Sequence, residues 1–288
     1  PAEAPPTAVG DACEASNGAP PEIVFRAYAR LVEVHATVTD GRGRYVDDLT
    51  AEQFTIRQGG QPVKVAAFEK STAAISCALL LDTSHSMQAA LPALKSAALQ
   101  LIAALREKDS VAVYSLSGGI SELQTFTTDK AASTGAVLRA GLGGETALYD
   151  ALVRVNRELA GRRGKKAIVV FTDGADNMST LAAETAILRA RTAGVPIHTI
   201  AQGIALQNSR LLNELSGMSQ ATGGLAFTIQ TAEEIHDVFK RVLEDLLHGY
   251  LLLFQPPPAE DHTWCRIEVR LRDAGTRKVR AREGYFPE

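Results

Sequence analysis

Apolar and polar residues alternate along the first part of the chain, which is the pattern of a half-buried β-strand. The alternating apolar positions in the clearest stretch are Val32, Val34, Ala36 and Val38. Asp40-Gly41 then predicts a turn, and short apolar segments on either side of Gly59-Gly60 predict a hairpin. We therefore expect residues 21–72 to form an all-β block, preceded by a flexible leader of residues 1–20 that is rich in Pro, Ala and Gly.

From Ser76 onwards, continuous apolar runs are separated by longer segments with helical periodicity. The runs lack polar alternation, as expected for strands covered on both faces. They are Ala78–Leu81, Val111–Leu116, Ala167–Phe171, Val195–Ile200 and Leu225–Ile229. The helical segments are Met87–Arg106, Ala147–Leu159, Ala182–Ala193 and Ala232–Leu247. This alternation predicts an α/β domain over residues 73–248, built on a doubly wound, mostly parallel sheet, with His198 packed in its core.

Strand patterning returns in residues 249–288. Tyr250–Phe254 is one apolar run, and a later stretch, Ile267–Leu271, alternates apolar with charged residues. Because one β block precedes the α/β domain and another follows it, we expect the two blocks to pair into one smaller all-β sandwich that carries the α/β domain as an insertion. The basic residues near the end predict the solvated face of a strand, with a basic docking strip as the alternative. They are Arg277, Lys278, Arg280 and Arg282.

Composition narrows the classes of function. The 288 residues are 45% hydrophobic and 22% charged, and the net charge of -3 gives no reason to expect nucleic acid or an acidic membrane as a partner. No apolar run approaches the roughly 18 residues of a membrane-spanning helix. The first residue is proline and no apolar signal segment is present, so we expect a processed or trimmed chain.

Three cysteines are present, and none lies in the C-x-x-C pair that would indicate zinc or thioredoxin-type chemistry. Cys77 lies within an apolar run and is expected to be a buried free thiol. Cys13 and Cys265 could form a disulfide that joins the two ends of the chain if the compartment is oxidising.

Oxygen-bearing side chains follow the ends of two predicted strands and precede one helix. Asp82 ends the first run and is expected to lie on a loop, with Ser84 and Ser86 at alternate positions after it. Asp173 ends a second run, and the glycine loop Gly143–Thr146 lies between the two acids along the chain. Ligands of open α/β sheets bind at the carboxyl ends of the strands, so these three loops are expected to meet at one edge. Hard oxygen ligands of this kind suit a divalent cation such as Mg²⁺.

This ordered set resembles the metal-ion-dependent adhesion site of the von Willebrand factor type A (VWA) domain. The family pattern is D-x-S-x-S, then a threonine, then an aspartate, and the matching positions are Asp82, Ser84, Ser86, Thr146 and Asp173. The resemblance covers roughly residues 76–247 and implies a Rossmann-like fold in which these five residues hold Mg²⁺, with Mn²⁺ or Ca²⁺ as alternatives. The flanking β segments are similar to a bacterial secreted subgroup, which implies a secreted, periplasmic or cell-surface location.

The resemblance also implies how such a site captures a protein. Two carboxylates balance the charge of the cation without saturating it, so one position stays open to water or to an incoming carboxylate. The expected partner is therefore a protein that offers Asp or Glu, bound by a monomeric adhesion module that is not an enzyme. From the rim of the site, His85, Gly144, Glu145 and Asp176 are expected to contact that partner.

Plainer interpretations of the same residues stay open. Ser86 and Thr146 are also suited to cap the helices that follow them, and Asp173-Gly174 to form an ordinary turn. His85 could be an exposed loop histidine, and Asp176 a surface acid. Two other function classes also remain: a metal-assisted hydrolase, for which no nucleophile with an orienting partner is evident, and a structural protein with a vestigial or empty site.

Overall fold

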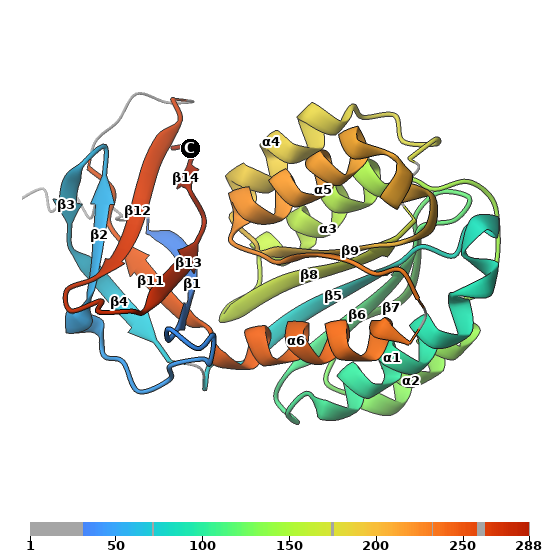
Figure 1. Cartoon of the computed structure of the whole chain (residues 1–288), viewed down its shortest axis with the longest axis horizontal. Coiled ribbons are helices and arrows are strands. Elements are labelled where there is room, and N and C mark those ends of the chain that lie inside the picture. The colour runs from blue at the N-terminus through green and yellow to red at the C-terminus, as the bar shows by residue number, and fades with distance from the viewer. Residues whose placement is uncertain (1–30, 71, 174–175, 232, 258–262, 288) are drawn as a thin grey trace, which may run out of the picture.

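The computed structural model describes residues 31–70, 72–173, 176–231, 233–257 and 263–287, and the predicted leader lies outside them. Figure 1 shows an α/β domain beside a smaller pair of sheets. The chain leaves the smaller body after β4 (Val65–Glu69) and returns to it at β11 (Tyr250–Phe254). The predicted fold class, a doubly wound sheet domain inserted into an all-β sandwich, is therefore confirmed, while the residue limits of each domain stay predictions.

The α/β domain is built on a six-stranded sheet of order β10-β9-β8-β5-β6-β7. Its strands are β5 (Ile75–Leu81), β6 (Ser110–Ser115), β7 (Ser121–Thr127), β8 (Lys165–Thr172), β9 (Ile197–Ala201) and β10 (Ala226–Thr228). All neighbouring pairs are parallel except β6 with β7. Every residue of β5 and β8 is buried, which explains their continuous apolar runs. The sequence pattern missed β7 because this edge strand is mostly polar and partly exposed.

In the described part of the chain, six helices cover the two faces of this sheet. They are α1 (Leu91–Ala104), α2 (Lys130–Arg139), α3 (Leu148–Ala160), α4 (Ala183–Ala193), α5 (Ser209–Thr222) and α6 (Glu234–His248). Figure 1 shows α1, α2 and α6 on one face and α3, α4 and α5 on the other, and a separate apolar cluster lies under each set. The helix predicted from Met87 begins at Leu91 instead, because a 3₁₀ turn over His85–Ala89 precedes it and a proline lies in its first turn.

The sandwich consists of two four-stranded antiparallel sheets, of order β13-β1-β11-β4 and β14-β12-β2-β3. Its remaining strands are β1 (Val32–Thr39), β2 (Phe54–Gln58), β3 (Gln61–Val63), β12 (Cys265–Leu271), β13 (Lys278–Ala281) and β14 (Gly284–Tyr285). The predicted hairpin is formed by β2 and β3. In the first sheet β11 pairs with both β1 and β4, and in the second β12 pairs with β2. Segments from both sides of the insertion therefore share each sheet.

Arg282 joins the sandwich to the α/β domain, which corrects the prediction that it lies on the solvated face of a strand. Its residue is 5% exposed, and its guanidinium donates to the carbonyl oxygen of Arg191 at 2.6 Å and to that of Thr192 at 3.4 Å. These carbonyls lie at the end of α4, where the last carbonyl oxygens of a helix have no N–H donor within the helix. Gly194 ends that helix with a φ of 64°, and a Cβ there would lie 1.7 Å from the guanidinium. Burial lowers the pKa of Arg282 to about 10.

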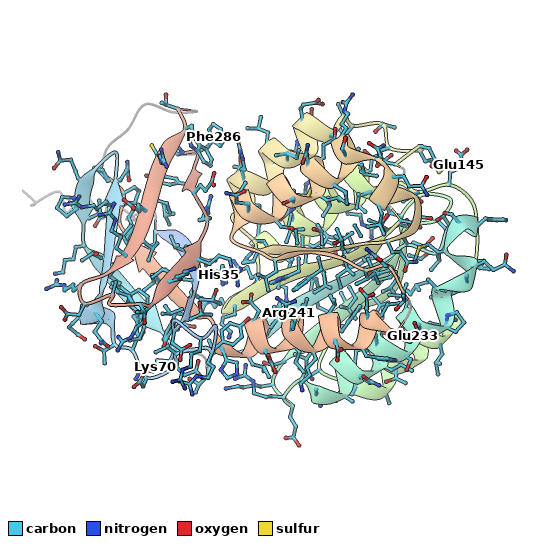
Figure 2. All side chains as sticks on the ribbon, viewed as in Figure 1. His35, Lys70, Glu145, Glu233, Arg241 and Phe286 are labelled. Carbon is cyan, nitrogen blue, oxygen red and sulfur yellow. The ribbon has the colours of Figure 1, made fainter. Side chains whose placement is uncertain are left out.

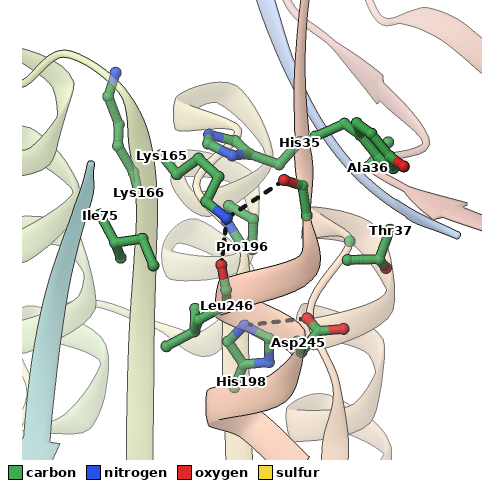
Figure 3. A pocket seen from close by; sticks show the side chains of 13 residues that line it. His35, Ala36, Thr37, Ile75, Lys165, Lys166, Pro196, His198, Asp245 and Leu246 are labelled. Carbon is green, nitrogen blue, oxygen red and sulfur yellow. Dashed lines mark hydrogen bonds and ion pairs between the residues drawn. The ribbon is translucent and has the colours of Figure 1, made fainter. Parts of the chain in front are cut away.

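Two more cations make similar contacts at the same junction. Arg280 donates to the carbonyl oxygen of Gly223, directly after α5, and to the carboxylate of Asp245 on α6. Lys165, at the start of β8, donates to the carbonyl oxygen of Leu246 near the end of α6, as Figure 3 shows. Three helix ends thus receive positive charge from this junction, which is the arrangement that stabilises a helix C-terminus. Arg277 and Lys278 are exposed, as predicted.

His198 is a packed core residue, as predicted, and is expected to make the protein sensitive to acid. Its Nδ1 accepts from the backbone N–H of Leu225 at 3.3 Å, its Nε2 lies 3.8 Å from Asp245, and burial lowers its pKa to about 4. Below pH 6.5 the unfolded chain binds a proton here that the folded chain does not, so stability falls by up to about 1.4 kcal/mol per pH unit down to about pH 4.

Urea unfolding at pH 7 and pH 5 measures this effect. The stability of His198→Asn should change less between the two pH values than that of the wild type. His35, whose pKa burial lowers to about 3, gives a further contribution of the same sign in both proteins. An equal pH dependence in the two proteins would show that His198 binds its proton as readily in the folded chain as in the unfolded one.

Two further sequence expectations concern the cysteines and membrane-spanning segments. Cys77 is a buried free thiol, as predicted. The predicted pairing of Cys13 with Cys265 lies outside the described residues, because Cys13 is not among them. Within the part of the chain that is described, no helix combines the length and the apolar character needed to cross a membrane.

Candidate metal centre

Asp82 lies at the centre of the predicted site, on a loop as expected, but it is buried there. It follows the last residue of β5 and is 0% exposed. Its Oδ1 accepts from the backbone N–H of Ser84 at 3.0 Å, and the hydroxyl of Thr146 is shared between Oδ1 and Oδ2 at 3.2 and 3.3 Å. The hydroxyl of Thr172 donates to Oδ2 at 2.7 Å. Polar loops cover this strand end, so a carboxylate can be buried there with hydrogen bonds.

Asp173 is the second buried acid, at 4% exposure, directly after β8. Burial raises its pKa, the charge of Asp82 adds to that effect, and a hydrogen bond from Ser86 opposes it. The hydroxyls of Ser84 and Ser86 are 3.0 Å apart. The structure therefore brings the five predicted ligands into one cluster. Among the described residues, no lysine, arginine or histidine forms an ion pair with either acid.

The alternative interpretation of Ser86 and Thr146 as helix caps is not supported by the structure. The 3₁₀ turn is preceded by Ser84 rather than Ser86, and no side chain caps it. At the start of α3 the N-cap position is Ala147, and again no side-chain hydrogen bond caps the helix. The hydroxyl of Thr146 is directed to Asp82 instead. Both hydroxyls are therefore available to the acids rather than to a helix terminus.

Thr83 ties the loop after β5 to two neighbouring segments, a role that the sequence motif did not indicate. Its residue is 0% exposed, and its hydroxyl lies 2.8 Å from that of Ser115 and 2.7 Å from that of Ser117. Its carbonyl oxygen accepts from the backbone N–H of Gly143 at 2.9 Å. The loop that carries Ser84 is thus held against β6 and against the glycine loop before α3.

The glycine loop is held close to its neighbours by backbone contacts. A Cβ at Gly144 would lie 2.9 Å from the Cα of Gly118, so a side chain there would force the two loops apart. The backbone N–H of Gly118 donates to the carbonyl oxygen of Glu145 at 2.8 Å. Asn177, which sequence reasoning missed, accepts from the backbone N–H of Thr146 through its Oδ1 at 2.9 Å. These contacts place Thr146 beside Asp82.

An open hollow of about 380 Å³ lies over the cluster. Its lining includes three of the four predicted partner contacts, all of them exposed: His85, Gly144 and Glu145. Glu145 lies at the end of the α/β domain remote from the sandwich (Figure 2). Asp176 is not brought to the hollow, because its carboxylate accepts from the backbone N–H of Tyr149 and from Ser179. It holds residues 176–179 against the start of α3 instead.

The donor set suits a hard divalent cation. It offers two carboxylates and three hydroxyls, all of which bind a metal through oxygen, and the adjoining hollow leaves space for a further ligand. Within the described residues there is no group of three or more His, Cys, Asp or Glu that could hold a metal without hydroxyl ligands. A softer site built from cysteine and histidine is therefore not offered by this part of the chain.

Comparisons with known proteins agree with the fold. The von Willebrand factor type A domain model matches residues 77–241, and no curated protein matches the chain. A von Willebrand factor type A structure from Catenulispora acidiphila has a TM-score of 0.54 and 13% identity, covering 88% of this chain and 73% of that one. The vWF domain of the type V pili tip protein Mfa5 from Porphyromonas gingivalis has a TM-score of 0.52 and 14% identity, covering 60% and 95%.

A third similar structure is that of proximal thread matrix protein 1 from the mussel byssus with a zinc-occupied MIDAS motif. Its TM-score is 0.52 at 18% identity, covering 64% of this chain and 47% of that one, so this chain spans about half the length of the mussel protein. The family model covers more than half of the 288 residues. The chain therefore belongs to the von Willebrand factor type A domain family.

Proposed function

We propose that this protein is a metal-dependent binding module that captures a protein partner through a carboxylate. The proposed ion is Mg²⁺, with Mn²⁺ or Ca²⁺ as alternatives, and its ligands are Asp82, Ser84, Ser86, Thr146 and Asp173. The observation that carries the proposal is the pair of buried acids beneath an open hollow, with no cationic side chain to balance them among the described residues. When bound, the ion supplies positive charge and an open coordination position.

The electrostatics of the cluster support a divalent ion. Two like charges close together in a poorly solvated place oppose each other, and the raised pKa of Asp173 reflects both burial and the charge of Asp82. A divalent cation would balance both carboxylates, whereas the serine and threonine hydroxyls add oxygen ligands without further charge. The centre would then be neutral and would still attract an anionic ligand.

The hollow supports access by a partner. His85 and Glu145 are exposed on its rim, so a side chain from another protein can approach the ligands without a change of fold. The zinc-occupied motif of the mussel protein and the pilus-tip origin of the Porphyromonas domain are in keeping with metal-dependent adhesion at a surface. We extend these properties to this chain as proposals, together with a secreted or cell-surface location and a monomeric state.

Mn²⁺ relaxation of water protons tests the proposal. The full chain is expected to bind one Mn²⁺ whose open position holds water, which enhances the relaxation rate. A short peptide with one internal aspartate should lower this enhancement by displacing the water, and its asparagine counterpart should not. A matched control is Asp237→Asn, which removes an exposed acid from α6 and should bind Mn²⁺ as the wild type does.

Other outcomes identify the alternatives. A wild-type chain that binds neither Mn²⁺ nor Mg²⁺ by calorimetry would identify a structural protein with a vestigial site. Metal binding with turnover of simple phosphate esters would instead identify a metal-assisted hydrolase. Equal responses to the two peptides would contradict recognition of a carboxylate while leaving metal binding intact.

A further inference from the structure

We propose that Thr172 is a positioning residue, which orients Asp82 for the metal ion without binding the ion itself. This inference rests on the proposed metal site. Thr172 is the last residue of β8, is 0% exposed, and donates its hydroxyl to Oδ2 of Asp82 at 2.7 Å. It is not among the five predicted ligands and does not line the hollow.

The register of the central sheet explains why these two side chains meet. Parallel pairing places Leu81 of β5 beside Phe171 of β8, so the residues that follow this pair in the chain are Asp82 and Thr172. The backbone N–H of Asp82 also donates to the carbonyl oxygen of Phe171 at 3.0 Å. Backbone pairing therefore continues up to the acid, and the threonine hydroxyl is held at a fixed place beside it.

The three donors to Asp82 are not equivalent. The hydroxyl of Thr146 is shared between both carboxylate oxygens at 3.2 and 3.3 Å, which are long distances for a hydroxyl donor. The hydroxyl of Thr172 donates to Oδ2 of Asp82 at 2.7 Å, a short distance typical of a well-formed hydroxyl bond. Thr146 also lines the hollow, so it can turn from the acid towards an ion, whereas Thr172 is enclosed and has no such path.

This difference assigns separate roles to the two threonines. The terminal torsion of an aspartate side chain is broad, so an unrestrained carboxylate samples many orientations. The bond from Thr172, with that from the backbone of Ser84, restrains both oxygens of Asp82 from the protein side. The lone pairs that remain can face the hollow. Removing a side chain that hydrogen-bonds to a metal ligand typically lowers the affinity for the metal by roughly 10- to 100-fold.

The chain position of Thr172 adds a second consequence. It directly precedes Asp173, so the end of one strand supplies both the second acid and the hydroxyl that orients the first. A displacement at the end of β8 would therefore disturb both carboxylates together. The two acids are expected to act as one unit in metal binding although they are far apart in sequence.

Calorimetry with Mn²⁺ on the full chain tests the role of Thr172. Thr172→Val keeps the shape but removes the hydroxyl, and its affinity for Mn²⁺ should fall roughly 10-fold or more. Thr172→Ser restores the hydroxyl and should recover most of the affinity. The melting temperature in chelator shows that each variant is folded. The Asp237→Asn protein, which should bind Mn²⁺ as the wild type does, is the control for the effect of a substitution outside the site.

The outcomes separate this inference from the proposed function. If the wild type binds Mn²⁺ and Thr172→Val binds it equally well, the positioning role is wrong while the metal site stands. If Thr172→Ser is as weak as Thr172→Val in folded protein, the methyl group rather than the hydroxyl matters, which also overturns the role. If the wild type binds no Mn²⁺, both the proposed function and this inference are overturned.

Discussion

Replacing Asp82 with asparagine is expected to abolish metal binding and to make the metal-free protein more stable. Asparagine keeps the shape of the side chain and an acceptor for the N–H of Ser84. The hydroxyls of Thr146 and Thr172 can reverse and accept from the new amide. The variant also removes the charge that opposes Asp173 in the buried cluster. Loss of one of two anionic ligands should weaken Mg²⁺ binding by more than roughly 100-fold.

Melting temperatures with chelator and with saturating Mg²⁺ measure both effects. Metal that binds only the folded state adds about 2.7 kcal/mol of stability at a concentration 100 times Kd. The wild type and Asp237→Asn should gain this stability, and Asp82→Asn should gain none. In chelator, Asp82→Asn should melt above the wild type. A variant that melts lower in chelator and keeps the Mg²⁺ shift would show that Asp82 is a structural acid and not a ligand.

Asparagine is a sharper probe than alanine at this position because Asp82 is fully buried. Alanine would leave the N–H of Ser84 and two hydroxyls without their acceptor, and an unpaired buried polar group costs about 1–3 kcal/mol. A loss of stability in the alanine variant would then be ambiguous. The asparagine variant separates the charge of the ligand from its place in the hydrogen-bond network.

That the proposed ligands would lie together could be predicted, because the two acids among them have a local signature. Asp82 and Asp173 end continuous apolar runs, and such runs become buried parallel strands whose ends lie at one edge. The burial of Asp82 could not be predicted in the same way. It depends on Thr146, which lies 64 residues away, and on Thr172, which lies 90 residues away. No local pattern records which loops will close over a strand end.

The supporting residues were missed for the same reason. Asn177 and Thr172 look like ordinary polar residues in a loop and a strand end, and only the contact with Thr146 or Asp82 gives them a role. Arg282 was expected in solvent because it is one of the alternating basic residues that predicted the solvated face of a strand. Its contact with the end of α4 joins residues that are 91 positions apart in the sequence. Because no local pattern indicates such a contact, the charge of Arg282 led to the wrong prediction that it is exposed. Long-range polar contacts were therefore the least predictable part of the structure.

Replacing Arg282 with methionine is expected to destabilise the protein by about 3 kcal/mol and to weaken the connection between its two domains. Methionine fills much of the same volume, but it leaves the carbonyl oxygens of Arg191, Thr192 and Gly284 without this donor. The gain from no longer burying a charge offsets part of the loss, as the pKa of Arg282, lowered to about 10, indicates. Urea unfolding measures the change, with the exposed Arg277→Met as the matched control.

A second substitution shows whether the buried guanidinium itself is responsible. Gly194→Ala places a Cβ where the guanidinium lies, at a φ of 64° that disfavours any side chain. In the single variant, which keeps Arg282, the alanine must displace the guanidinium as well as adopt this backbone conformation. In Arg282→Met only the backbone penalty, about 1 kcal/mol, should remain. The double variant should therefore be more stable than the sum of the two single losses predicts. Strictly additive losses would show that the guanidinium does not occupy the space above Gly194, and the contact with α4 could not then connect the domains.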